Sequence, residues 1–324
     1  MSSESDFIAL MRALADDPGA RGLMDDAATL DIGGETLVLT HDMIVEGVHY
    51  RADDPAADVA WKLVAVNMSD LAAKCALPRG VLLGFSLAGN AEWDRDFAIG
   101  LRDALAHFGA PLLGGDTVSV PAGAPRSLGM TAIGTAPVTG APTRAGTKAG
   151  DLVYVSGSIG NAGAGLALLS GGAAARNEAE QALIAAYRRP MPALALGRDL
   201  APLVTAMADI SDGLLIDAGR IAAASGCAIR VELDRVPLSP PFLAVRGESQ
   251  DSRLFAATAG DDYRLLLTVP PGRAGAGAAV ADRHGIGLTR VGACAAGQGL
   301  SLFHEARELP LPSRLGYEHS DILP

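Results

Sequence analysis

Apolar residues recur along the chain with two different spacings. Within 58–73, Trp61, Val64 and Met68 recur at three- and four-residue intervals, which predicts a helix with an apolar face. Short runs of branched apolar residues, such as 36–41, instead predict strands. The same criteria predict helices at 7–15, 58–73, 93–108, 162–169, 178–188, 193–200 and from the turn at 211–213 to 224. They predict strands at 36–41, 81–87, 127–136, 151–156, 205–210, 228–233, 264–269 and 288–292.

The mixed order of these elements indicates two domains. It favours an α+β N-terminal domain and an α/β C-terminal domain with a mixed sheet. A length of 324 residues also exceeds the usual size of a single hydrophobic core. The segment 137–150 is rich in Pro, Gly and Thr, so it is the best candidate for the boundary. We therefore expect domains at 1–137 and 138–324.

The overall charge limits the possible partners. The formal net charge is −11, which argues against bare nucleic acid or an anionic membrane as a partner. An acidic protein can still bind ATP if divalent metal ions bridge the two. Residues 152–175 carry no charge and are long enough to mimic a membrane span. Their many glycines instead predict a buried strand, a turn and a helix of small residues.

The N-terminus and the cysteines bear on location. The first residues are acidic and lack the basic and apolar regions of a signal peptide. Cys75, Cys227 and Cys294 lie far apart without metal-ligand spacing, which favours free thiols in a reducing cytosol. We therefore expect a cytoplasmic protein.

Aspartates recur where predicted strands or helices end. Asp42 follows the strand predicted at 36–41, and Asp212 follows the one at 205–210. Element ends hold functional loops, because the scaffold fixes them while their side chains stay accessible. Caps and turns also favour aspartate, so each position has a purely structural interpretation as well. The other acidic positions of this kind are Asp25, Asp26, Asp116, Asp209, Asp261 and Asp262.

Asp70 differs because it lies inside the helix predicted at 58–73. Asn67, Asp70 and Lys74 form a polar stripe on an otherwise apolar helix. This stripe either points into a cleft or is a solvated face with an Asp70–Lys74 pair at i,i+4 spacing.

Three further features also have two interpretations. His49 is either a functional group or a satisfied histidine, and Arg144 is either a ligand-binding or a solvated residue. The series Gly157-x-x-Gly160-x-x-Gly163 is weak as a phosphate loop and favours close packing.

Converging aspartates would favour phosphate chemistry through metal ions. Carboxylates that approach one another resist ionising unless a positive charge lies among them. Hard oxygen ligands suit Mg²⁺, which shares its coordination shell readily with phosphates. The chain has neither the P-loop motif G-x-x-x-x-G-K-[ST] nor the protein-kinase motifs. We therefore expect several Mg²⁺ ions held by aspartates.

Eight short motifs occur in order between Gly22 and His319, at 25–28, 40–49, 65–73, 114–117, 143–157, 209–214, 260–263 and 316–319. Any one of them is weak evidence, but eight in order are highly specific. In this series the chain resembles the thiamine-monophosphate kinase family. That family belongs to the superfamily of aminoimidazole ribonucleotide synthetase and selenophosphate synthetase.

The resemblance implies a homodimer whose N-terminal domains pair, with active sites near the interdomain cleft. It implies that ATP contacts Gly115, Asp116, Arg144 and Ser211. It implies that thiamine monophosphate contacts His49, Asp261 and Tyr317. The implied Mg²⁺ ligands are Asp26, Thr40, His41, Asp42, Asp70, Asp116, Asp209 and Asp212.

The expected reaction is direct in-line transfer of the γ-phosphoryl group of ATP to thiamine monophosphate. The acceptor phosphate is already largely deprotonated near neutral pH, so no obligatory protein base is expected. The metal-binding residues Asp42 and Asp212 are expected to be the most critical.

Several positions depart from the family pattern, and none of them removes a core carboxylate. They are Met24, His41, Ser119, Asn161 and Asp261, which we interpret as subfamily variation. One alternative is another ATP-using enzyme of the superfamily, which the absence of a cysteine before Cys75 and the Asp321–Pro324 terminus disfavour. The other is a non-catalytic protein that binds a nucleotide or a thiamine phosphate.

Overall fold

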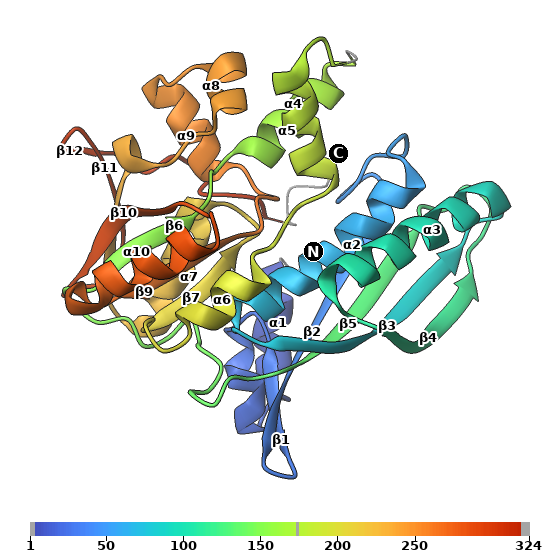
Figure 1. Ribbon diagram of the computed structural model, residues 1–324, viewed down its shortest axis with the longest axis horizontal. Helices are drawn as coiled ribbons and strands as arrows, with labels where there is room; N and C mark the ends of the chain where they lie inside the picture. The colour runs from blue at the N-terminus through green and yellow to red at the C-terminus, as the bar shows by residue number, and fades with distance from the viewer. Residues whose placement is uncertain (1–3, 173–174, 319–324) are drawn as a thin grey trace.

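The computed structural model describes residues 4–172 and 175–318, which form two sheets with helices packed against them (Figure 1). The N-terminal sheet has the strand order β1-β2-β5-β3-β4. Its strands pair antiparallel, except that β3 and β4 are parallel. The bounds are β1 Ala28–Ile32, β2 Glu35–Val45, β3 Leu77–Leu87, β4 Leu112–Ser119 and β5 Ser127–Thr135.

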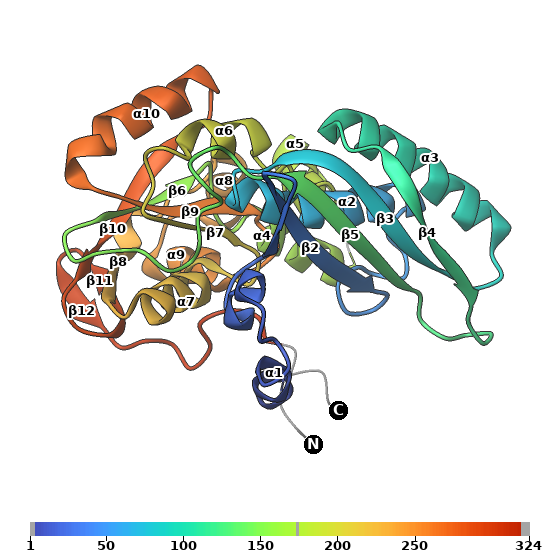
Figure 2. The same cartoon turned by 90° about the horizontal axis from the view of Figure 1, so that it is seen from below.

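Helices α2 (Ala56–Ala73) and α3 (Ala91–Phe108) cover one face of this sheet (Figure 2). Along β2, the buried side chains of Val38, Thr40 and Ile44 alternate with exposed ones because successive residues of a strand point to opposite faces. Met43 lies on the opposite face and is 51% exposed. The N-terminal sheet is therefore packed on one side and open on the other in the described part of the chain.

The C-terminal sheet has seven strands in the order β12-β11-β8-β10-β6-β9-β7. It is mixed, because β8 and β11 are parallel whereas the other neighbours are antiparallel. The bounds are β6 Leu152–Ser156, β7 Ala206–Ile210, β8 Ala228–Glu232, β9 Arg264–Val269, β10 Leu288–Ala295, β11 Gly299–His304 and β12 Arg307–Leu309.

Both faces of the C-terminal sheet are covered. The side chain of Ala208 on β7 packs in the cluster of α7 (Leu214–Ser225), whereas Met207 packs with α6 (Leu194–Leu200) and α10 (Ala274–Arg283). A smaller core joins α4, α5, α8 and α9 around Phe242. The remaining helices are α1 Glu4–Arg12, α4 Asn161–Ser170, α5 Glu178–Arg188, α8 Pro240–Arg246 and α9 Gln250–Thr258.

Helix α2 joins the two halves of the molecule. Its residues Ala72 and Ala73 belong to the same apolar cluster as α6 and β9. The contact with α6 is close, since a Cβ atom on Gly197 would lie 2.3 Å from the Ala72 carbonyl oxygen. The Trp61 indole N–H donates a hydrogen bond of 3.0 Å to the Pro190 carbonyl. Any side chain that α2 directs between the domains is thereby held from both sides.

The expected combination of an α+β and an α/β half with a mixed sheet is confirmed. The uncharged stretch forms β6 and α4, as expected, and none of the described helices is long and apolar enough to cross a membrane. The expectation that a strand ends before Asp42 is wrong, because β2 continues to Val45. The alternative interpretation of 114–116 as a turn is also wrong, because β4 runs through these residues. The division at 137/138 stays a prediction.

Candidate functional site

A cavity of about 1460 Å³ is lined by residues of both sheets and their connections. Asp42 and Asp70 contribute to its wall from the N-terminal half, and Asp209 and Asp212 from the C-terminal half. A pocket for one drug-sized ligand typically measures roughly 300–1,000 Å³, so this volume has room for two small molecules.

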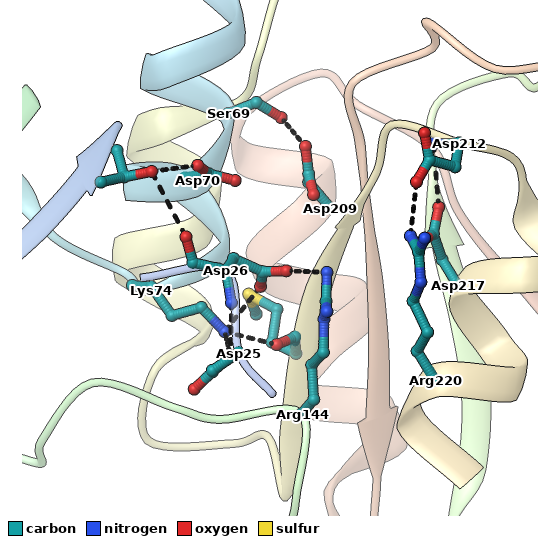
Figure 3. A network of polar contacts seen from close by, with 12 residues as sticks. Asp25, Asp26, Ser69, Asp70, Lys74, Arg144, Asp209, Asp212, Asp217 and Arg220 are labelled. Carbon is teal, nitrogen blue, oxygen red and sulfur yellow. Dashed lines mark hydrogen bonds and ion pairs between the residues drawn. The ribbon is translucent and has the colours of Figure 1, made fainter. Parts of the chain in front are cut away.

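Three aspartates converge at this wall from distant parts of the sequence. Asp26 precedes β1, Asp70 lies within α2, and Asp209 lies on β7 (Figure 3). One carboxylate oxygen of each lies within 4.8 Å of the others. The Ser69 hydroxyl donates to Asp209 across the domains at 2.7 Å, and the Thr40 hydroxyl donates to Asp70.

Burial and mutual repulsion both raise the pKa values of Asp70 and Asp209. Burial raises the pKa of Asp70 well above its usual range, and the charges of Asp42, Asp209 and Asp26 raise it further. Burial also raises the pKa of Asp209, again with a contribution from Asp26. A buried carboxylate resists ionising unless a positive charge compensates it.

Asp42 belongs to the same group although it lies inside a strand. Its backbone N–H donates to the Asn67 side-chain oxygen at 3.1 Å, which fixes β2 against α2. Burial raises the pKa of Asp42 to about 6, and the charges of Asp26 and Asp212 contribute to this shift.

Two basic side chains balance the negative charge at one edge of this group of aspartates. The ammonium of Lys74 lies 2.7 Å from Asp26 and also forms an ion pair with Asp25, and Arg144 forms an ion pair with Asp26. Burial alone would raise the pKa of Asp26, but Lys74 and Arg144 bring it below its ordinary value. Asp26 is therefore ionised, whereas Asp42, Asp70 and Asp209 form no ion pair within the described residues.

Asp212 is held by a separate network. The Arg220 guanidinium contacts Asp212 at 2.6 Å and Asp217 at 2.7 Å. The buried Asp217 accepts the Gly213 backbone N–H at 3.2 Å, which fixes the turn between β7 and α7. The interpretation of Asp212 as a helix cap is wrong, because Gly213 occupies the N-cap position. The i,i+3 spacing of Asp217 and Arg220 is the sequence signal that predicts this pair.

Two of the residues expected to contact thiamine monophosphate, His49 and Asp261, share one buried lysine. Lys62 on α2 donates to the Asp261 carboxylate at 2.7 Å and to the His49 carbonyl at 2.9 Å. The Tyr263 hydroxyl donates to the other oxygen of Asp261 at 3.0 Å. Tyr317 lines the same cavity, and its backbone N–H donates to the Asp212 carbonyl at 2.9 Å. Sequence reasoning missed Lys62, because Asp261 lies 199 residues away.

Most of the predicted site residues line the one cavity. Besides those described above, they are Asp26, His41, His49, Arg144, Ser211, Asp261 and Tyr317. Thr40 is one contact away from the cavity, because its hydroxyl donates a hydrogen bond to Asp70 in the cavity wall.

Gly115 and Asp116 are not brought to the cavity within the single chain. They lie on β4, whereas Asp42 lies on β2, and two strands separate β4 from β2. With strands about 4.8 Å apart, the separation is roughly 14 Å. Their role in nucleotide binding stays a prediction. His319 of the last motif lies outside the described residues.

The structure also decides between the interpretations of the polar stripe. Asn67, Asp70 and Lys74 are all buried, so a solvated face is wrong. Lys74 pairs with Asp25 and Asp26 and not with Asp70, so the expected i,i+4 pair is wrong.

Two of the three further features have opposite outcomes. Solvation of Arg144 is wrong, since its side chain is 16% exposed and paired with Asp26. Close packing of the glycine series is confirmed, because a Cβ on Gly160 would lie 2.5 Å from that of Ala256.

The donor set fits a divalent cation. Both carboxylate oxygens of Asp26 are buried, and each forms an ion pair with a basic side chain, Oδ2 with Lys74 and Oδ1 with Arg144. Each oxygen keeps a second lone pair to offer, and the neighbouring donors are carboxylates of Asp70 and Asp209. All-oxygen, carboxylate-rich sets suit Mg²⁺ or Mn²⁺.

Comparison with known proteins places the chain in a family. Residues 24–136 match the N-terminal domain of AIR synthase related proteins, and residues 148–305 match the C-terminal domain. A thiamine-monophosphate kinase of Caulobacter vibrioides is 39% identical, over 98% of this chain and 91% of that protein.

Two solved structures have the same fold. The thiamine-monophosphate kinase of Stenotrophomonas maltophilia is 33% identical, with a TM-score of 0.78 and coverage of 94% of this chain and 96% of that one. The structure titled "AaThiL complexed with AMPPCP and TMP" is 26% identical, with a TM-score of 0.84 and coverage of 98% and 97%. Taken with the converging aspartates, these matches show that the chain belongs to the thiamine-monophosphate kinase family of AIR synthase related proteins.

Proposed function

We propose that this protein phosphorylates thiamine monophosphate with ATP, yielding thiamine diphosphate and ADP. The observation that carries the proposal is the convergence of Asp26, Asp70 and Asp209 from two domains on one cavity large enough for both substrates. Relatives that cover nearly the whole chain are named for this activity, and the structure of one neighbour is titled as a complex with AMPPCP and TMP.

Several Mg²⁺ ions are proposed as the cofactor. When bound, they would link the carboxylates to phosphate oxygens and offset the negative charge of the two substrates. The high pKa of Asp70 and Asp209 supports this assignment, because a cation is what would keep both ionised. The proposed ligands are Asp26, Thr40, His41, Asp42, Asp70, Asp116, Asp209 and Asp212.

The chain's own residues position the two substrates. Arg144 is charged and partly exposed beside Asp26, so it is placed to contact phosphate oxygens together with Ser211 and the proposed Gly115 and Asp116. Asp261 is held by two donors and would give a fixed acceptor for thiamine monophosphate, together with His49. The ring of Tyr317 would stack on a heteroaromatic ring.

The test is conversion of thiamine monophosphate by the purified protein with ATP and Mg²⁺, followed by chromatography of the products. We expect thiamine diphosphate and ADP in equal amounts. Asp42→Ala and Asp212→Ala should each lower kcat by about 10²–10³-fold or more, because each removes charge from the reacting centre. Asp103→Asn, at an exposed ion pair on α3, is the matched surface control.

Two results would contradict the proposal. Tight binding of both compounds without ADP formation would instead support a non-catalytic binding protein. Near-normal turnover in either aspartate variant would refute its metal-binding role.

We also propose that the protein is a homodimer paired through its N-terminal sheets. The uncovered face of that sheet carries large apolar side chains, with Met43, Leu82 and Val118 each at least 41% exposed. Exposed apolar patches of this kind mark association surfaces. Asp116 belongs to the same face, since it shares a row of the sheet with Gly84, Gly129 and Met43. A second copy on this face would cover the patch.

A cytoplasmic location is proposed with the function. All three cysteines are buried free thiols within the described residues, as suits a reducing compartment.

A further inference from the structure

Lys74 is an unusual residue for the interior of a protein. It caps the C-terminal end of α2, and its side chain is 0% exposed. Its ammonium forms ion pairs with Asp25 and Asp26 and donates to the Met207 carbonyl at 3.1 Å (Figure 3). Two carboxylates and one backbone carbonyl therefore hold the ammonium, and lysine is almost never fully buried unless it is paired.

Lys74 divides the acidic group into two parts. On the side of Lys74, Asp25 also forms an ion pair with Arg21 at 2.6 Å, and Asp26 also forms one with Arg144. Two carboxylates are therefore paired with three basic side chains. On the other side, Asp42, Asp70 and Asp209 have no ion-pair partner among residues 4–172 and 175–318. Positive charge is thus built into one part and missing from the other.

The basic side chains Arg144, Arg220 and Lys74 differ in how exposed they are. Arg144 and Arg220 are 16% and 36% exposed and line the cavity, so a ligand that enters it can contact both. Lys74 has no exposed surface, and it is anchored by a backbone carbonyl of β7. It therefore stays in place whatever enters the cavity.

We propose that Lys74 is a fixed cation that occupies the place of one divalent metal ion beside Asp25 and Asp26, and so directs the metal ions to Asp42, Asp70 and Asp209. Asp26 is shared between the two parts, because its oxygens face Lys74 on one side and Asp70 and Asp209 on the other. Lys74 is a positioning residue that acts through Asp26. The inference rests on the proposed function, because it assumes that metal ions bind at this site.

The experiment counts metal ions directly, without turnover. Binding of Mn²⁺ to the nucleotide-free protein is followed by the electron paramagnetic resonance signal of free Mn²⁺. Lys74→Met should bind about one additional Mn²⁺ per chain, because Asp25 and Asp26 lose the only cation among the described residues that contacts both, whereas Arg21 and Arg144 each pair with one of them. The double variant Asp25→Asn with Lys74→Met should return to the wild-type number, since it also removes one negative charge.

Lys62→Met is the matched control. Lys62 lies on the same helix, is also buried at 2% exposed and is also paired with an aspartate, but its partner Asp261 lies outside the acidic group. Loss of the Lys62 ammonium should destabilise the fold without changing the number of Mn²⁺ ions bound per chain. If Lys74→Met unfolds without metal, refolding on addition of Mn²⁺ supports the proposal, and failure to refold at saturating Mn²⁺ overturns it.

The outcomes separate this inference from the proposed function. An unchanged Mn²⁺ number in Lys74→Met, with an active wild type, overturns only the role of Lys74. A wild type that neither binds Mn²⁺ nor forms thiamine diphosphate overturns the proposed function itself.

Discussion

At the scale of single residues, the buried aspartates of the site lower the stability of the metal-free protein when they ionise. Asp42, Asp70 and Asp209 are buried near one another, and each has a raised pKa as a result. A raised pKa means that the folded state binds a proton more tightly than the unfolded chain. Ionising these groups above their folded pKa therefore costs free energy that only a bound cation can recover.

Asp42 gives a measurable form of this cost. Its pKa rises from 3.8 to about 6, so the free energy of unfolding of the metal-free protein should fall as pH rises through this interval and stay lower above it. Asp42→Asn removes the charge and should stabilise the metal-free protein at pH 8 by on the order of 1–3 kcal/mol. Well below pH 3.8 the gain should vanish, because the aspartate is then protonated in both the folded and the unfolded state.

Urea unfolding in the presence of a chelator, at pH 8 and well below pH 3.8, measures this difference. The same variant should lose activity, which would separate the chemical role of the charge from any structural one. A less stable Asp42→Asn at pH 8 would show that Asp42 is compensated in the fold by groups other than metal ions.

At the scale of elements, α2 determines the geometry of the site. It carries Asp70 and Lys74 on one side and packs against α6 on the other. The close approach depends on Gly197, where a Cβ would meet the Ala72 carbonyl oxygen at 2.3 Å. The position of the acidic group is therefore sensitive to a contact that touches none of its members.

Gly197→Ala should destabilise the protein by about 1–3 kcal/mol, because the added methyl forces α2 and α6 apart. It should also lower kcat, since Asp70 moves with α2. Gly219→Ala in α7 is the matched control, because no atom lies within 4 Å of its Cβ position. That variant should gain up to about 1 kcal/mol from its higher helix propensity. Thermal unfolding of both variants tests the pair, and equal effects would contradict the packing argument.

The same elements show what sequence patterns can predict. The helix at 178–188 and the strand at 264–269 have the expected bounds, because their apolar spacing is local. β4 was missed because Gly114, Gly115 and Asp116 favour a turn in isolation, and only the pairing with β3 makes them a strand. The interpretation that Lys74 pairs with Asp70 is wrong for a related reason. Its actual partner Asp25 lies 49 residues away, and only the folded chain brings the two together.

At the scale of the whole molecule, one cavity takes its walls from both domains, but two residues of the proposed nucleotide site lie elsewhere. Gly115 and Asp116 lie on β4, away from the cavity of their own chain, and Asp116 points to the uncovered face of the N-terminal sheet. The proposed homodimer resolves this separation if β4 of one copy approaches the cavity of the other. Each active site would then need residues of two chains.

Mixing two inactive variants tests this arrangement. In a dimer of Asp42→Ala with Asp116→Ala, one site would hold both substitutions and the other neither, so mixed preparations should recover about a quarter of the wild-type activity. Asp42 and Asp212 line the same cavity of one chain, so the corresponding mixture of Asp42→Ala with Asp212→Ala should recover none. Sedimentation of differently tagged copies confirms exchange. If exchanged dimers of the first pair stay inactive, Asp116 does not act in the partner's site, because symmetry leaves no other way to lose both sites.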